Sequence, residues 1–266
     1  MILIKNLTGV VINPAVLALG EERVVISRLT RGYDFNNNNL LDVVGIAQRV
    51  NQKGQLTGPT RLILLELRPN SSIEKLWEYQ PEKGSFIDVR IADIDNDGQK
   101  DFIAICQQDY ASDHQSEWLY IFGVRRGKVI RKDISLVQNI SQVRPEQMDI
   151  GDFNGDGKED ILISSGSPSR AAYLIIKETL DNRDNIFTLK KIDLEPGISK
   201  FSILAANIDT TKGDEIIMVS GQESVKLFSY NLQKGQISPE PFILQEEKVT
   251  NLLKSNLATA NIDGKY

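Results

Sequence analysis

The sequence contains one cysteine, one histidine and two tryptophans among 266 residues. A single cysteine cannot form an intramolecular disulfide, so the fold must be held together in other ways. Cys106 lies in the apolar run Phe102–Cys106, which predicts a buried strand and a core thiol. His114 lies in a polar stretch, residues 109–117, that predicts a solvated loop. Catalytic mechanisms that depend on histidine or cysteine therefore have almost no material in this chain.

Long apolar runs and an excess of basic charge are also absent. No run approaches the roughly 18 apolar residues of a membrane span. The opening segment is interrupted by Lys5, Asn6 and Pro14 and lacks a basic start, which makes it a poor signal peptide. The 36 acidic and 31 basic residues give a formal charge of −5, whereas a nucleic-acid partner calls for a basic face. We predict neither a membrane span nor a nucleic-acid partner for this chain.

The chain does contain an acidic loop that is repeated at an even interval. DFNNNNLLD begins at Asp34, DIDNDGQKD at Asp93 and DFNGDGKED at Asp152, so successive copies start 59 residues apart. We call residues 34–42, 93–101 and 152–160 loops 1, 2 and 3. Each loop has oxygen-bearing side chains at its first, third, fifth and ninth positions. Oxygen ligands at alternate positions of a short loop are typical of a calcium site.

The predicted ligands are those four side chains and the main-chain carbonyl of the seventh residue. In loop 2 they are Asp93, Asp95, Asp97, Gln99 and Asp101; in loop 3, Asp152, Asn154, Asp156, Lys158 and Asp160; in loop 1, Asp34, Asn36, Asn38, Leu40 and Asp42. The sharp turn at the sixth position favours glycine, as in Gly98 and Gly157, and Asn39 replaces it in loop 1. Counting carboxylates predicts that loop 2 binds best and loop 1 worst. The alternative is that the loops are ordinary Asx-rich turns without an ion.

Two further copies of the loop are degenerate or cut short. Residues 207–215 form a fourth copy, in which Gly213 falls one position late, Thr211 replaces a carboxylate and Glu215 is the closing acid. This predicts a metal-free copy of the turn. A fifth copy begins at Asn261, and the sequence stops inside it. We therefore expect residues 1–266 to be a fragment of a longer repeat protein.

The segments around the loops predict an all-β fold of repeated four-stranded units. The predicted strands are residues 86–94, 101–107, 118–124 and 128–136 in the second repeat; 147–150, 160–164, 171–177 and 186–194 in the third; and 201–208, 215–220, 225–231 and 242–245 in the fourth. Residues 23–30 are the strand that enters loop 1, and the residues before them are expected to end an earlier unit. Strands that follow the loops are apolar on successive residues, which predicts burial on both faces. Four strands in about 55 to 60 residues are typical of a β-propeller blade.

Gly151–Ile161 and Ala92–Gly98 resemble the FG-GAP and VCBS repeats of integrin-α-like β-propellers. Through its repeat period the resemblance covers nearly the whole chain. It implies that each loop joins the first two strands of a blade and binds calcium, and that this chain supplies about four and a half blades of a seven-bladed propeller. The Phe-Gly and Gly-Ala-Pro elements of the repeat are not evident. The chain is therefore more similar to the bacterial VCBS type than to an integrin head.

Three functions follow as hypotheses. The first is a non-catalytic, calcium-binding propeller module that binds a protein or a carbohydrate, or acts in adhesion, outside the cell or at its surface, where calcium is near millimolar. The second is the propeller part of a polysaccharide lyase or hydrolase, for which Tyr110 and Arg170 are isolated candidates. The third is a purely structural repeat module. Trp77 is expected in the core, whereas Trp118, beside a polar loop, is compatible with the core or with a sugar-binding platform.

Overall fold

The computed structural model describes residues 16–107, 118–132, 135–136, 143–166, 171–177, 186–193, 201–207, 212–220, 226–231, 236–237 and 242–243. These residues form strands and turns, and none of them is helical, which confirms the all-β prediction. In this part of the chain no helix is long and apolar enough to cross a membrane. Tyr110, His114, Arg170, Thr211 and the fifth loop lie outside the described residues.

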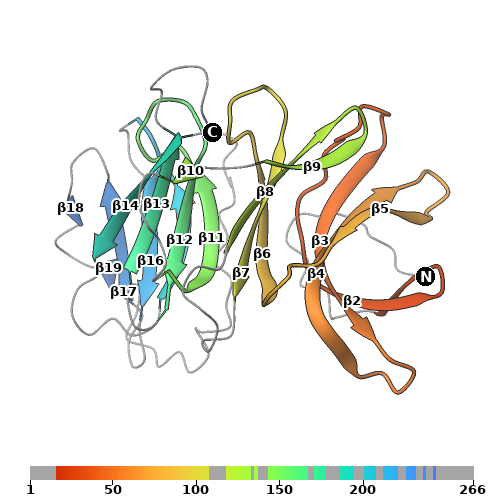
Figure 1. Cartoon of the computed structure of the whole chain (residues 1–266). Helices are drawn as coiled ribbons and strands as arrows, with labels where there is room; N and C mark the ends of the chain where they lie inside the picture. The colour runs from red at the N-terminus through yellow and green to blue at the C-terminus, as the bar shows by residue number, and fades with distance from the viewer. Residues whose placement is uncertain are drawn as a thin grey trace. The chain divides into compact units, whose positions relative to one another are not determined.

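The chain divides into two compact units, residues 1–133 and 134–266. Unit 1 contains two sheets (Figure 1). Sheet A consists of β1 (Val16–Leu19), β2 (Glu22–Leu29), β3 (Leu41–Val50), β4 (Leu56–Leu67) and β5 (Ile73–Tyr79). Sheet B consists of β6 (Ser85–Ala92), β7 (Asp101–Gln107), β8 (Leu119–Arg125) and β9 (Lys128–Lys132). In both sheets the strands pair antiparallel in sequence order.

Unit 2 contains the other two sheets. Sheet C has the order β10 (Ser135–Leu136), β14 (Ile186–Asp193), β13 (Ala171–Lys177), β12 (Asp160–Ser165) and β11 (Pro145–Gly151). Sheet D consists of β15 (Phe201–Ala206), β16 (Glu215–Ser220) and β17 (Lys226–Asn231), with β18 (Gln236–Ile237) and β19 (Phe242–Ile243) both paired with β17. All pairs are antiparallel except β10 with β14.

Each acidic loop connects two consecutive antiparallel strands of its sheet. Loop 1 connects β2 with β3, loop 2 connects β6 with β7, and loop 3 connects β11 with β12. The described part of the fourth copy connects β15 with β16. In sheets B, C and D the loop joins the first two strands of the antiparallel meander, as the resemblance implies, whereas in sheet A the preceding strand β1 makes β2 and β3 the second and third strands.

The strands that follow the loops are buried on both faces. In β3 and β4, Val44 and Leu62 belong to a core shared with sheet B, while Val43 and Ile63 belong to a second core on the opposite face of sheet A. In unit 2, Leu162 of β12 and Met218 of β16 belong to one core, which joins sheets C and D. Successive apolar residues thus reach two different cores, as predicted from their pattern.

Two strand predictions differ from the structure. Val16–Leu19, expected to end an earlier unit, pairs with β2 through a hairpin at Gly20 and adds a fifth strand to sheet A. The strand predicted for residues 128–136 ends at Lys132, and Ser135–Leu136 pairs with β14 of sheet C instead. The β-propensity of the sequence continues across this break, because it reports suitable side chains and not which sheet accepts them.

The two tryptophans and the cysteine belong to the interior. Trp77 packs against Phe102 and Phe122, with ring centroids 5.5 and 5.1 Å away. Trp118 is buried, which decides between its two interpretations in favour of the core. Cys106 is buried on β7, and burial raises the pKa of its thiol to about 12. The expected core thiol is confirmed.

Candidate metal centre

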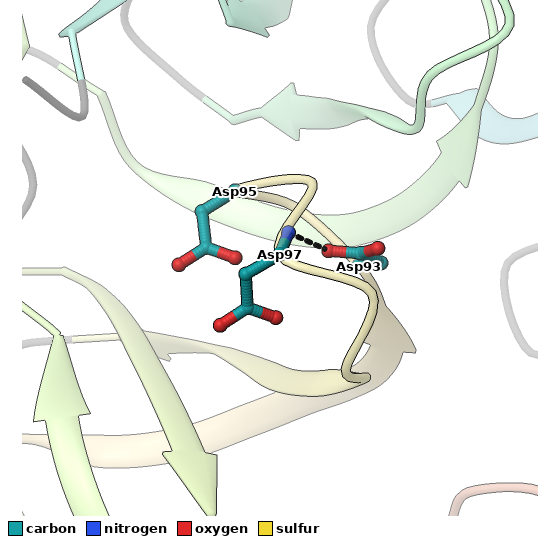
Figure 2. Close-up of side chains that lie close together, drawn as sticks. All are labelled: Asp93, Asp95 and Asp97. Atoms are coloured by element: carbon teal, nitrogen blue, oxygen red, sulfur yellow. Dashed lines mark hydrogen bonds between the residues drawn. The ribbon is translucent and has the colours of Figure 1, made fainter. Parts of the chain in front are cut away.

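The three loops share one hydrogen-bond pattern around their first residue. In loop 2 the amides of Asp97 and Gly98 donate to the two carboxylate oxygens of Asp93, each at 3.0 Å. Figure 2 shows the bond from Asp97. The same two bonds reach Asp34 in loop 1 and Asp152 in loop 3, at 2.8 to 3.1 Å. The first aspartate thus fixes the loop by accepting one main-chain hydrogen bond on each carboxylate oxygen.

The fifth residue holds the seventh in the same way. The amides of Leu40, Gln99 and Lys158 donate to Oδ1 of Asn38, Asp97 and Asp156 at 2.8 or 2.9 Å. In loops 1 and 3 the third residue also accepts a bond from the amide of the fifth, through Asn36 and Asn154. The three copies are therefore three instances of one backbone conformation.

Two positions of this conformation lie in the left-handed region. At the sixth position Asn39, Gly98 and Gly157 have φ of 63°, 84° and 87°, which confirms the predicted turn. The fourth residues, Asn37, Asn96 and Gly155, also have positive φ, which the sequence analysis missed. The signal was present, because asparagine and glycine are the residues that enter this region most easily.

The closing aspartates are the most buried groups of the loops. Asp42, Asp101 and Asp160 are all at most 1% exposed. Burial raises the pKa of Asp42 to about 6 and the pKa values of Asp101 and Asp160 to about 7. The amides of Phe35 and Phe153, second residues of their loops, donate to Asp42 and Asp160 at 3.0 and 3.2 Å. A buried carboxylate with a raised pKa calls for a cation or a proton beside it.

In loop 2 the carboxylates gather, and a lysine already lies among them. Asp93, Asp95 and Asp97 bring one oxygen each to within 4.8 Å of one another (Figure 2). Nζ of Lys132, from the end of β9, lies 2.6 Å from Asp95 Oδ2 and 2.7 and 2.9 Å from the two oxygens of Asp101. It lies 3.6 Å from Asp97 Oδ2. The sequence analysis missed Lys132, which is 31 residues from Asp101 along the chain.

Burial alone would lower the pKa of Lys132, because it disfavours the charged amine. The hydrogen bonds to Asp101 and Asp95 and the negative charges of both carboxylates have the larger effect, in the opposite direction. The pKa of Lys132 is therefore raised above its ordinary value. The side chain is a cation inside loop 2.

Loop 1 carries an additional carboxylate that the motif does not contain. Glu66 of β4 pairs across the sheet with Asp42 and is buried. Its Oε2 accepts bonds from the side-chain amides of Asn38 and Asn36 at 2.5 and 3.3 Å, and Arg68 lies 3.0 Å from Oε1. The register of β3 with β4 brings Glu66 opposite the closing aspartate, so the sequence of the loop alone gives no signal for it. With it, loop 1 has three carboxylates and not two.

Loop 3 is attached to the fourth copy of the loop. The amide of Asp152 donates to Oδ2 of Asp214 at 2.8 Å, and the amide of Asp214 donates to the carbonyl of Asp152 at 2.7 Å. Asn207 donates its side-chain amide to the carbonyl of Gly213 at 2.7 Å. The described part of the fourth copy thus fixes the neighbouring loop, and whether the fourth copy binds metal stays a prediction.

Loops 1 and 3 fit a hard divalent cation. Their side-chain donors are all oxygens, and their closing carboxylates are buried with raised pKa values. Oδ1 of Asp42 is buried and has no hydrogen-bond partner within the described part of the chain. Such an atom requires a partner, and a cation among Asp34, Glu66 and Asp42 would provide one. The donor set is that of calcium, and magnesium would demand a stricter octahedral arrangement.

The chain matches no protein-family model, and none of the curated proteins matches it significantly. The resemblance to FG-GAP and VCBS repeats thus rests on the loops and on the order of the strands around them.

Proposed function

We propose that this protein is a non-catalytic, calcium-binding β-propeller module that binds a protein or a carbohydrate ligand. One observation carries the proposal: an oxygen-lined loop with a buried closing carboxylate recurs between two consecutive antiparallel strands in sheets A, B and C. A turn that served only to reverse the chain would not need a fully buried aspartate at its end.

The propeller is supported by the packing within each unit. Phe35 of loop 1 packs on Phe102, the residue that follows the closing aspartate of loop 2, with ring centroids 5.6 Å apart. In unit 2, Phe153 of loop 3 shares a core with Ile216, the residue that follows Glu215. Loops 1 and 3 are therefore each anchored in the core between their own sheet and the next sheet of the same unit, as expected for blades that stack face to face.

Calcium in this role stabilises the fold and positions surface loops. In loops 1 and 3 an ion would neutralise carboxylates that burial otherwise makes costly. The loops would then use their acidic groups on the ion, not in a reaction. Millimolar calcium outside the cell would fill even modest sites of this kind, so we propose an extracellular or cell-surface location.

Calorimetric titration of chelator-treated protein with calcium, followed by thermal melting, tests the metal sites. We expect binding of calcium and a higher melting temperature, because a ligand that binds only the folded state stabilises it. Asp156→Ala should remove one site and its share of the stabilisation. Glu82→Ala, which removes an exposed acid outside the loops, should change neither. Absence of heat and an unchanged melting temperature would show that the loops are ordinary turns.

A panel of polysaccharides and protein ligands, screened with calcium and with chelator, tests the proposed ligand binding and the two alternative functions. Calcium-dependent binding without turnover supports a binding module. Formation of an unsaturated or newly reducing sugar product would instead favour the polysaccharide-degrading enzyme. Binding to no member of the panel, together with a calcium-dependent melting temperature, would favour the purely structural repeat module.

A further inference from the structure

Loop 2 has the strongest calcium motif of the chain, yet its centre contains a side chain of the protein itself. Nζ of Lys132 lies within 3.6 Å of three of the four loop carboxylates, and the side chain is 8% exposed. Calcium lies 2.3 to 2.6 Å from its oxygen ligands and binds to groups from all around the loop. The ammonium group, 2.6 to 2.9 Å from the oxygens of Asp95 and Asp101, lies where the ion would have to bind.

The neighbouring strand is shaped to admit this lysine. Continuing the register of β7 and β8 by one residue places Gly123 opposite Asp101. A Cβ atom at Gly123 would lie 2.6 Å from Cε of Lys132 and 3.0 Å from Oδ1 of Asp101. Its φ is not among the positive values, so the glycine is needed for space and not for a turn.

The other sheets have no such opening at this position. The residue opposite the closing aspartate is Glu66 in sheet A and, by the same continuation of the register, Ile176 in sheet C. A glycine opposite the aspartate and a buried lysine that crosses it occur together in sheet B alone among the described sheets.

We propose that Lys132 takes the place of the metal ion in loop 2, so that this loop is held by a tethered cation and calcium binds to the other loops. The inference rests on the proposed function for its calcium sites. With Lys132 included, the charge of the loop 2 site falls from −4 to −3, equal to that of Asp152, Asp156 and Asp160 in loop 3. The number of carboxylates therefore no longer predicts a higher calcium affinity for loop 2 than for loop 3. A calcium ion that bound to loop 2 would also have to displace the lysine.

Lys132→Met tests the proposal, because methionine keeps most of the length of the side chain and removes its charge. Lys128→Met, at an exposed lysine of the same strand, is the matched control. In calorimetric titration Lys132→Met should bind one more calcium ion than the natural chain, or bind at loop 2 at least about tenfold more tightly. The double variant Lys132→Met/Asp95→Ala should lose that gain. The same number of ions and the same affinities in Lys132→Met and the natural chain would overturn the proposal.

Melting in excess chelator separates this proposal from the function on which it rests. Without metal, Lys132→Met leaves four neighbouring carboxylates without their cation and should melt well below Lys128→Met. If no variant binds calcium, the proposed function fails, but a lower melting temperature of Lys132→Met alone still supports the tethered cation. Equal melting temperatures of the two lysine variants in chelator would refute it.

Discussion

At the scale of single residues, we expect the closing aspartates to make the stability of the protein depend on both pH and metal. Asp160 has a pKa of about 7 because it is buried and lies near Asp156 and Asp152, although the amides of Phe153 and Asn154 partly offset this. The unfolded chain has the ordinary value of 3.8. An aspartate whose pKa is raised on folding destabilises the folded state increasingly as the pH rises from about 4 to about 7.

We therefore predict that, in chelator, the natural chain gains stability on acidification relative to Asp160→Asn. The difference should be about 1 kcal/mol for each pH unit between pH 7 and pH 5, since one proton is taken up on folding there. Denaturant unfolding of both proteins at pH 7.5 and 5.5 measures it. With calcium the sign reverses, because the ion needs the ionised carboxylate and its affinity falls as the pH falls. Parallel stabilities of the two proteins at every pH would contradict this account.

Glu66 offers a second test at the residue scale. It is buried, accepts hydrogen bonds from two side-chain amides of loop 1 and lies beside Arg68. Glu66→Gln should lower the free energy of unfolding in chelator by about 1 to 3 kcal/mol, because the side-chain amides of Asn36 and Asn38 lose a charged, buried acceptor. It should also weaken calcium binding to loop 1.

Glu74→Gln is the matched control for Glu66→Gln. Glu74 also pairs with Arg68, but its side chain is 51% exposed. A pair at the surface contributes about 0 to 1 kcal/mol, so this change should have a small effect. Equal losses in the two variants, measured by urea unfolding, would show that the contacts of Glu66 with loop 1 are unimportant.

At the scale of the element, each loop depends on the apolar residue at its second position. Phe153 is 1% exposed and belongs to the core that includes Leu162, Leu174 and Met218. We predict that Phe153→Ala costs about 3 to 5 kcal/mol of stability, because it removes a large buried ring and leaves a cavity. Since the amide of Phe153 also holds Asp160, the variant should bind calcium more weakly at loop 3.

Urea unfolding and calcium titration of Phe153→Ala check this prediction. Leu56→Ala is a suitable control, because Leu56 lies in a strand but is 55% exposed. Phe153→Leu should lose less stability than Phe153→Ala and keep the calcium site. A loss of stability with unchanged calcium affinity would show that the anchor and the site are independent.

The strands and loops also show which parts of the fold and of the candidate site could be predicted from the sequence. The strand on each side of a loop and the position of the turn were predictable, because both are set by local residue pattern and by the conformational freedom of Gly98, Gly157 and Asn39. Glu66 and Lys132 were not, because each reaches its loop from another strand and only the register of the sheet brings it there. The end of β9 at Lys132 was missed for a similar reason, since the residues on both sides of the break suit a strand equally well.

At the scale of the whole molecule, repetition determines how the loops act together. A single four-stranded sheet of this kind has two apolar faces and must bury both against neighbours. The structure shows this within unit 1 and within unit 2, where a loop residue contributes to the core shared with the next sheet. An ion that fixed one loop would therefore stabilise the packing between two sheets of a unit, so we expect the effect of calcium to reach beyond the strands that bind it.

The total charge of the molecule gives the last prediction. The chain has a formal charge of −5 at pH 7 with its histidine neutral. Two calcium ions, in loops 1 and 3, would bring it to −1, whereas three would bring it to +1. Because Lys132 occupies loop 2, we expect two ions. In capillary electrophoresis at pH 7 the protein should slow in calcium but still migrate as an anion.

Asp156→Ala and Lys132→Met make this measurement specific. Asp156→Ala starts at −4 and, with loop 1 alone occupied, should reach −2 and remain a faster anion in calcium than the natural chain. Lys132→Met starts at −6 and should approach zero with three ions bound, because its loop 2 is then open to calcium. Reversal of the natural chain to a cation would mean that loop 2 binds metal despite its lysine. Mobility that does not respond to calcium would mean that none of the loops does.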